Sequence, residues 1–361
     1  MQIETAKTVI FCKQLIYSIF IAMKKYIFLS VVFVGLLSFG CKRKKEASLP
    51  SPNKSEVKEI QKQLEVKIKR YDKALYSIPK DSLGSSLEKL QKEYAFFIPE
   101  NPSRPEIADA MREHLNTNKQ LYEAVQTKFA DLTDLEKQFA EAFSLLRYYF
   151  PDASLPQIYT FVSGLDYEHF VMYYGDTLLI PLDLFLGKDY KLYKRLGSEV
   201  PQYIKRRFSR EYILPTCLGE ISYKYISAKP LQSNLLDAML LEGKFLLFLE
   251  MMLPSLPDSL LFPFPQEKIQ WAKDNEANIW AYLIQNNYLY SRDKTVMRKL
   301  VGEAALTSYF GNDSPGRVGA WIGWQICRSW VEKNPQKKIA ELFAETDAQK
   351  ILTASKYKPP K

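Results

Sequence analysis

The stretch that decides the fold runs from Pro156 to Gly187 and reads PQIYTFVSGLDYEHFVMYYGDTLLIPLDLFLG. Three runs within it are rich in aromatic and β-branched residues, at positions 158–161, 170–174 and 177–180. Gly164 and the pair Gly175-Asp176 separate these runs. Such runs between turn residues predict strands, and the Gly-Asp pair predicts a tight turn between the second and the third. A small sheet is therefore expected here.

On both sides of this stretch, apolar residues recur at three- and four-residue intervals, which is the period of an amphipathic helix. One such stripe consists of Leu135, Phe139, Ala142, Phe143 and Leu146. Helices are expected at residues 83–97, 107–150, 203–210, 214–227, 235–252, 267–287, 295–310, 316–333 and 337–352. The alternation of Leu64, Val66 and Ile68 with charged residues predicts one more strand. The expected fold class is α+β, mostly helical, with many helices around a small sheet of about three to four strands.

Residues 23–40 have the order of a bacterial lipoprotein signal peptide. Lys24 and Lys25 follow Met23, and residues 26–37 are an apolar run too short to span a bilayer comfortably. Gly40 directly before Cys41 looks like a lipobox, in which the cysteine thiol carries diacylglycerol and becomes the mature N-terminus. The alternative is an uncleaved helical anchor with an incidental cysteine. Both interpretations tether the chain to a membrane.

The domain organisation follows from this signal. Residues 1–22 add a second apolar stretch before it, so we expect them to be a misassigned upstream extension and translation to begin at Met23. Residues 41–56 are mostly Lys, Ser, Pro, Glu and Asn, which is typical of a flexible tether. Because no second linker, repeat or low-complexity run follows, residues 57–361 are expected to form a single domain.

Composition excludes global disorder, since 47% of the residues are hydrophobic and 14% are aromatic. The formal charge is +9, and residues 1–40 contribute four lysines and one glutamate, so the mature chain carries about +6. Four of these charges lie in the run 42–45. No basic stripe remains that would favour nucleic acid. The expected partners are the membrane, through the N-terminal lipid, and other proteins of the cell envelope.

Two cysteines remain after Cys41, namely Cys217 and Cys327. They could form a disulfide in an oxidising compartment. Both lie in apolar, helix-like segments, however, and this favours two separate buried thiols.

Residues that could carry catalysis or bind a metal are scarce. His114 lies on a predicted polar helical surface, and His169 lies in a loop between two predicted strands. Neither has a second histidine four residues away, so the helical zinc site of a peptidase cannot be built, and no catalytic residue, metal or cofactor is expected. Glu220 and Glu242 have unusually apolar neighbours. Because a lone buried carboxylate is costly, each is either paired with a Lys, an Arg or a Tyr hydroxyl, or exposed at a groove.

A cluster of small residues at helical spacing lies near the C-terminal end of the chain: Gly316, Gly319, Ala320 and Gly323. Such spacing lets a neighbouring helix approach closely, and core packing is favoured here over a binding groove. Arg317 lies at the predicted start of this helix, where a cation is electrostatically disfavoured. An acidic partner, Glu242 or Glu220, would explain it.

Short motifs spread along the chain from about Leu64 to its end carry a family resemblance. They are Arg70-Tyr71-Asp72, Tyr148-Tyr149-Phe150-Pro151, Leu235-Leu236-Asp237-Ala238-Met239, Leu241-Glu242-Gly243-Lys244, Met252-Leu253-Pro254, Trp271, Asn275-Glu276, Trp280, Leu289-Tyr290-Ser291, Pro315-Gly316-Arg317-Val318-Gly319, Trp321-Ile322-Gly323-Trp324-Gln325-Ile326 and Ser355-Lys356-Tyr357-Lys358-Pro359. With the lipobox, they resemble the B-type gliding-motility lipoproteins of gliding bacteria. This resemblance implies a role in gliding motility and the associated secretion machinery, at the outer membrane and facing the periplasm.

That family is itself similar to zincin-like metallopeptidases, which have a small sheet, a helix carrying His-Glu-x-x-His and a later Glu-Gly that supplies a third metal ligand. The resemblance aligns Gly219-Glu220-Ile221-Ser222-Tyr223 with the metal-binding helix and Glu242 with the third ligand. Gly219 and Tyr223 replace both histidines. The resemblance thus implies a degenerate groove, lined by Gly219, Glu220, Tyr223, Glu242 and Arg317, in a non-catalytic protein-binding component. The alternatives are a divergent metal-dependent peptidase or metal-free hydrolase, and a lipoprotein that binds a small ligand or glycan through its aromatic residues.

Overall fold

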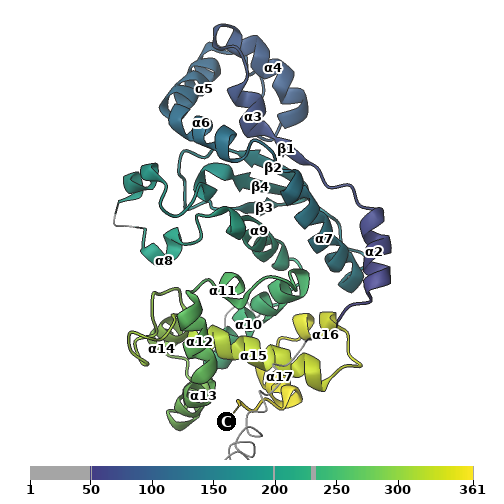
Figure 1. Cartoon of the computed structure of the whole chain (residues 1–361), viewed down its shortest axis with the longest axis vertical. Helices are drawn as coiled ribbons and strands as arrows, with labels where there is room; N and C mark the ends of the chain where they lie inside the picture. Colours follow the sequence, from purple (N-terminus) through teal and green to yellow (C-terminus); the bar gives the residue numbers. More distant parts are fainter. Residues whose placement is uncertain (1–48, 50, 198–199, 229–232, 361) are drawn as a thin grey trace, which may run out of the picture. The chain divides into compact units, whose positions relative to one another are not determined.

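A four-stranded mixed sheet organises the N-terminal part of the protein, seen in a computed structural model that describes residues 49, 51–197, 200–228 and 233–360 (Figure 1). Its strands are β1 (Ile68–Arg70), β2 (Gln157–Phe161), β3 (Met172–Tyr174) and β4 (Thr177–Pro181), in the order β1-β2-β4-β3. The pairs β1–β2 and β2–β4 are parallel, and β3 runs antiparallel to β4 as an edge strand. The upstream extension 1–22, the signal peptide 23–40 and Cys41 lie outside the described residues.

The three strands expected between Pro156 and Gly187 are confirmed. Gly175 makes the turn between β3 and β4 with φ +62°, a backbone conformation that glycine adopts without strain. The fourth strand is shorter than its alternating pattern suggested, because β1 begins only at Ile68. The backbone amide of Ile68 donates to the Glu136 carboxylate at 2.9 Å.

Helices make up most of the rest, which confirms the α+β, mostly helical fold class. Those that precede β2 are α2 (Lys54–Lys62), α3 (Tyr71–Tyr76), α4 (Leu83–Tyr94), α5 (Pro105–Thr117), α6 (Lys119–Lys128) and α7 (Thr133–Tyr149). Those that follow the sheet are α8 (Gln202–Lys205), α9 (Ile213–Ser222), α10 (Leu235–Met252), α11 (Asp258–Leu261), α12 (Gln266–Asp274), α13 (Glu276–Gln285), α14 (Lys294–Val301), α15 (Val318–Lys333), α16 (Ile339–Ala344) and α17 (Ala348–Ser355). No helix among these is both long enough and apolar enough to cross a membrane.

Several predicted boundaries were wrong. The helix expected at 267–287 is interrupted at Asn275, whose side-chain amide donates to the Trp271 carbonyl at 2.9 Å. The helix expected at 295–310 ends at Val301, and the following loop is held by Lys268, whose ammonium group donates to the carbonyls of Ala305, Asn312 and Ser314. The helix expected at 337–352 is two helices, α16 and α17.

The start of the described chain also differs from its pattern. Helix α2 begins at Lys54, inside the segment 41–56 expected to be a tether. The Asn53 side chain accepts from the Ser55 amide at 3.2 Å and caps the helix, and Val57 packs against the core. Residues Leu49–Lys361 make up one compact unit.

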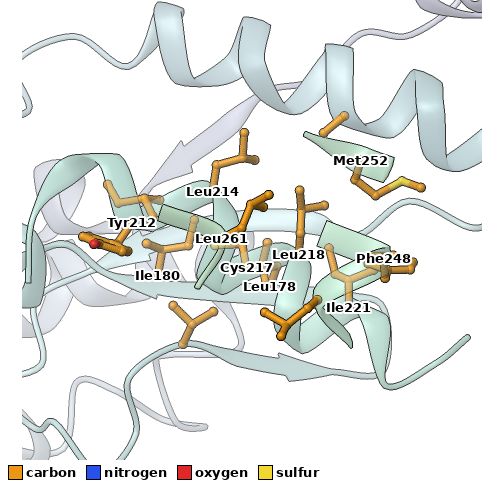
Figure 2. Packing of buried hydrophobic residues seen from close by; sticks show 14 of the residues in the cluster. Leu178, Ile180, Tyr212, Leu214, Cys217, Leu218, Ile221, Phe248, Met252 and Leu261 are labelled. Carbon is orange, nitrogen blue, oxygen red and sulfur yellow. The ribbon is translucent and has the colours of Figure 1, made fainter. Parts of the chain in front are cut away.

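Helix α9 connects the sheet to the C-terminal helices, as it packs against β3, β4 and α10. Its apolar residues recur at positions i, i+3, i+4 and i+7 and face the strand residues Leu178 and Ile180 of β4 (Figure 2). They are Leu214, Cys217, Leu218 and Ile221, all buried. Cys217 and Cys327 are both buried and both free, as expected. Because this face of α9 is buried, the residues on its opposite face lie outside this core.

Helices α10 and α15 are in backbone contact, and this confirms the packing role predicted for the small residues. A Cβ atom on Gly323 would lie 1.8 Å from the carbonyl oxygen of Met239. A Cβ atom on Gly243 would lie 2.2 Å from the carbonyl carbon of Gly323. Only glycine fits at either position. This contact places Glu242 of α10 beside the start of α15.

Candidate binding groove

The second stripe of α9 lines a groove of about 240 Å³. Its members, again at i, i+3, i+4 and i+7, are Thr216, Gly219, Glu220 and Tyr223. Across the groove stand Glu242 and apolar residues of α10, with Arg317 at its end. The structure thus brings together all five groove residues named from the sequence.

Arg317 is the central charge of the groove. It precedes α15 in the left-handed conformation, with φ 60° and ψ 33°, which is uncommon for a side chain of this size. Its side chain is 11% exposed and forms ion pairs with Glu242 and with Glu303, the latter at 3.1 Å. Its Nε–H donates to the Val301 carbonyl at 3.3 Å. The two carboxylates explain why a cation is stable at a helix start, and the expected acidic partner is Glu242.

The ion pairs continue away from the groove. Arg207 donates to both carboxylate oxygens of Glu303, at 2.8 and 2.7 Å. Desolvation would raise the pKa of Glu303, but the guanidinium groups of Arg317 and Arg207 outweigh it and hold that pKa below its usual value. The chain Arg207–Glu303–Arg317–Glu242 therefore ties the segment after α8 and the loop after α14 to α15 and α10. Glu303 was missed from the sequence, where it lies inside a predicted helix with no distinguishing neighbour.

Glu220 differs from the other acids of this region. No hydrogen bond or ion pair joins it to another residue within the described ranges. Burial raises its pKa. The pKa of the Tyr223 phenol is raised as well, by burial and by the negative charges of Glu220 and Glu242. Among the residues that the structure describes, Glu220 is thus a half-buried carboxylate without a counter-ion.

The donor set of the groove does not fit a zinc ion. Gly219 has no side-chain donor, and Tyr223 would coordinate only as a phenolate, which its raised pKa disfavours. Glu242 is already neutralised by Arg317. Within the described part of the chain, no three His, Cys, Asp or Glu side chains are grouped to hold a metal.

Lys244, two residues after Glu242 on α10, has a different partner. Its side chain is buried, and its ammonium group donates to the Glu345 carbonyl at 2.5 Å. Burial lowers its pKa. Within the motif Leu241-Glu242-Gly243-Lys244, Glu242 thus forms an ion pair with Arg317, whereas Lys244 donates to the segment after α16.

A second cavity, of about 770 Å³, lies beside α5 and is called here the histidine pocket because both histidines line it. The prediction that His114 lies on a polar surface was wrong. It is half-buried, with its Nδ1 3.3 Å from the Asn118 amide nitrogen and its Nε2 3.3 Å from the Tyr122 hydroxyl. Burial lowers its pKa. His169 lies in the expected loop, and its Nδ1 is 2.8 Å from the Asp166 carboxylate.

Other family-like motifs hold the fold together. Asp72 is fully buried and accepts from Arg70 Nε at 2.9 Å and from the Thr160 hydroxyl of β2 at 2.5 Å. Near the C-terminus, the Tyr357 hydroxyl donates to Glu276 at 2.9 Å. These hydrogen bonds join separate elements of the fold, while Tyr71, next to Asp72 in the same motif, lines the histidine pocket.

A family model described as "Gliding motility protein GldB" matches residues 51–359. No curated protein and no solved structure matches the chain. The matched range contains the sheet, the groove and the histidine pocket.

Proposed function

The chain belongs to the family of the gliding motility protein GldB, and from this premise we propose that it is a non-catalytic, protein-binding component of the motility and secretion machinery. Membership of this family makes it a gliding-motility lipoprotein and indicates envelope partners. We further propose that Cys41 carries the lipid and that the domain faces the periplasm from the outer membrane.

The ion pair between Arg317 and Glu242 is the observation that supports a non-catalytic role. If the groove derives from a zincin-type site, Glu242 stands where a third metal ligand would be. A guanidinium group neutralises that carboxylate instead, while Gly219 and Tyr223 stand at the two histidine positions. The groove is then a degenerate metal site that keeps its shape and its surroundings.

The degenerate-site proposal can be tested by rebuilding the site. The substitutions Gly219→His and Tyr223→His place two imidazoles four residues apart on α9, and Arg317→Met releases Glu242. A Cβ at Gly219 meets nothing within 4 Å, so the histidine has room. The triple variant should bind one zinc ion, measured by elemental analysis, because three protein ligands and a water complete such a site. A folded triple variant without zinc would contradict the zincin-type origin of the groove.

Partner binding can be tested with a photo-reactive amino acid at Tyr223, whose side chain is 65% exposed in the groove. The matched control is Tyr290, which is 58% exposed and lies elsewhere on the surface. In cells, the Tyr223 position should form a discrete adduct that mass spectrometry identifies as an envelope protein of the motility or secretion machinery. Equal adducts from both positions would contradict the proposal.

The anchor is tested separately. Cys41→Ala should abolish acyl labelling and cleavage by the lipoprotein route, while Met23→Leu in the native gene should abolish expression. Unchanged labelling of the Cys41 variant would contradict the anchor, and normal accumulation of the Met23 variant would show that the upstream start is used.

The histidine pocket favours a second candidate function, the binding of a small ligand. Its volume of about 770 Å³ suits such a ligand, and four aromatic residues contribute to its lining: Tyr71, Phe97, Tyr122 and Phe161. Native mass spectrometry of protein purified from its own membrane tests this candidate. A stoichiometric adduct that Met172→Trp removes from the pocket would support it, and an adduct-free chain would oppose it.

A further inference from the structure

We propose that the groove between α9 and α10 takes an arginine side chain from an exposed, otherwise apolar segment of its envelope protein partner, with Glu220 as the counter-ion. This inference rests on the proposed protein-binding function and adds the chemistry of the partner.

Charge in the groove region is unbalanced. Arg207 and Arg317 supply two positive charges, and Glu303 and Glu242 take both of them in ion pairs. Glu220 adds a third carboxylate, which leaves one net negative charge. Because no described residue pairs with Glu220, its carboxylate is available to a cation from outside the chain.

The walls around Glu220 suit the rest of an arginine side chain. The rings of Tyr223 and Phe245 lie 4.7 Å apart at 57°, and Tyr223 is largely exposed. Aromatic faces stack on guanidinium groups, and apolar walls cover an aliphatic stem. The wall from α10 continues with Leu246 and Leu249.

Space is present beside Glu220 as well. Gly219 leaves the adjoining helical position open, since a Cβ there would have no neighbour within 4 Å. The groove volume of about 240 Å³ is below the usual range for a drug-sized ligand and suits a single inserted side chain. Arginine is among the residues that most often serve as such an anchor at the centre of a protein interface.

An arginine is favoured over an acidic or neutral group for a further reason. Its fork of N–H donors matches a carboxylate in two parallel hydrogen bonds, and a half-buried carboxylate gains more from such a pair than an exposed one. An acidic side chain would have to compete with Glu242 and Glu303 for Arg317, which already donates to Glu242 and to the Val301 carbonyl.

The test measures fluorescence anisotropy of labelled peptides with the full chain in detergent micelles. The probe is Leu-Phe-Arg-Leu-Phe, and its matched control replaces Arg by citrulline, which keeps the shape and removes the charge. The arginine peptide should bind about tenfold tighter, the ratio that a charge-assisted hydrogen bond of about 1.4 kcal/mol gives. In the Glu220→Gln variant, the two peptides should bind equally.

Three results would overturn the inference: equal binding of both peptides to the unaltered chain, a preference for arginine that survives Glu220→Gln, and no binding of either peptide. The Tyr223 adduct in cells is independent of these measurements. An identified envelope adduct together with a failed peptide test would therefore refute the arginine anchor and leave the protein-binding function standing, whereas the loss of both would refute both.

Discussion

The groove between α9 and α10 and the histidine pocket are two cavities lined by titratable residues, and they differ in how those residues are paired. The groove is the smaller, about 240 Å³ against 770 Å³, yet its charged residues come from segments far apart in the sequence. In the pocket, His169 contacts Asp166, and His114 contacts Asn118 and Tyr122 as well as the backbone of the more distant Val162. The pocket is the larger space and both its histidines have partners, whereas in the groove Glu220 has none among the described residues. The groove is therefore the stronger candidate site, because it has unpaired charge, although the pocket has the larger volume.

The largest effect should come from the contact between α10 and α15, which places Glu242 beside the start of α15. Gly323→Ala places a Cβ against the Met239 carbonyl of α10, so the two helices must separate. We expect a loss of about 3 kcal/mol in the free energy of unfolding, measured by urea denaturation. The matched control is Gly219→Ala, which meets open space and should not destabilise the fold. Equal losses in both variants would contradict the backbone contact.

A smaller loss should follow from removing the central cation of the groove. Arg317→Met leaves Glu242 and Glu303 without their shared partner, and should lower the free energy of unfolding by about 2 kcal/mol. This is less than the loss for a fully buried pair, because both acids are partly exposed. Glu242→Gln should cost about 1 kcal/mol. The matching change in the pocket, Asp166→Asn, breaks an exposed contact and should cost less than about 0.5 kcal/mol. A larger loss for Asp166→Asn than for Arg317→Met would reverse the comparison.

Removing the charge of Glu220 should stabilise the fold rather than destabilise it. Glu220→Gln should raise the free energy of unfolding at pH 7 by about 0.5 kcal/mol, because burial of the charged form is penalised. The folded pKa lies above the ordinary value of 4.5, so the unaltered chain loses stability as pH rises from about 4.5 through the folded pKa. The difference between the two proteins should therefore vanish below about pH 4.5. Destabilisation by Glu220→Gln at pH 7 would show that Glu220 has a partner.

The smallest effect concerns His114. Burial lowers its folded pKa below the ordinary 6.5, so the unfolded state binds more protons as pH falls below 6.5, and stability is lost from there through the folded pKa. His114→Gln should reduce this loss by less than about 0.5 kcal/mol between pH 7.5 and pH 5, as measured by denaturation at both values. An unchanged pH profile would indicate that His114 is solvated rather than half-buried.

The sequence predicted those features that depend on local periodicity. The strands between Pro156 and Gly187 followed from runs of aromatic and β-branched residues between turn residues, and α10 followed from the helical spacing of apolar residues. Helix ends were missed where a side chain satisfies the backbone, as at Asn275, or where a distant residue such as Lys268 holds a loop. The spacing of apolar residues along the sequence carries no information on such contacts.

For the site, a chemical inconsistency in the sequence was informative. A cation at the start of α15 required an acid, and this led to the pair of Arg317 with Glu242. The role of Glu303 and the position of both histidines along one pocket depend on tertiary contacts between segments without a common motif. They became visible only in the folded chain.

The most direct test of the account is the zinc content of the purified full chain, because the groove is proposed to hold an ion pair in place of a metal. Elemental analysis should find no stoichiometric zinc in the unaltered protein, and Glu242→Ala should leave that result unchanged. About one zinc ion per chain, lost on Glu242→Ala, would show that Glu242 is a metal ligand and would contradict the account.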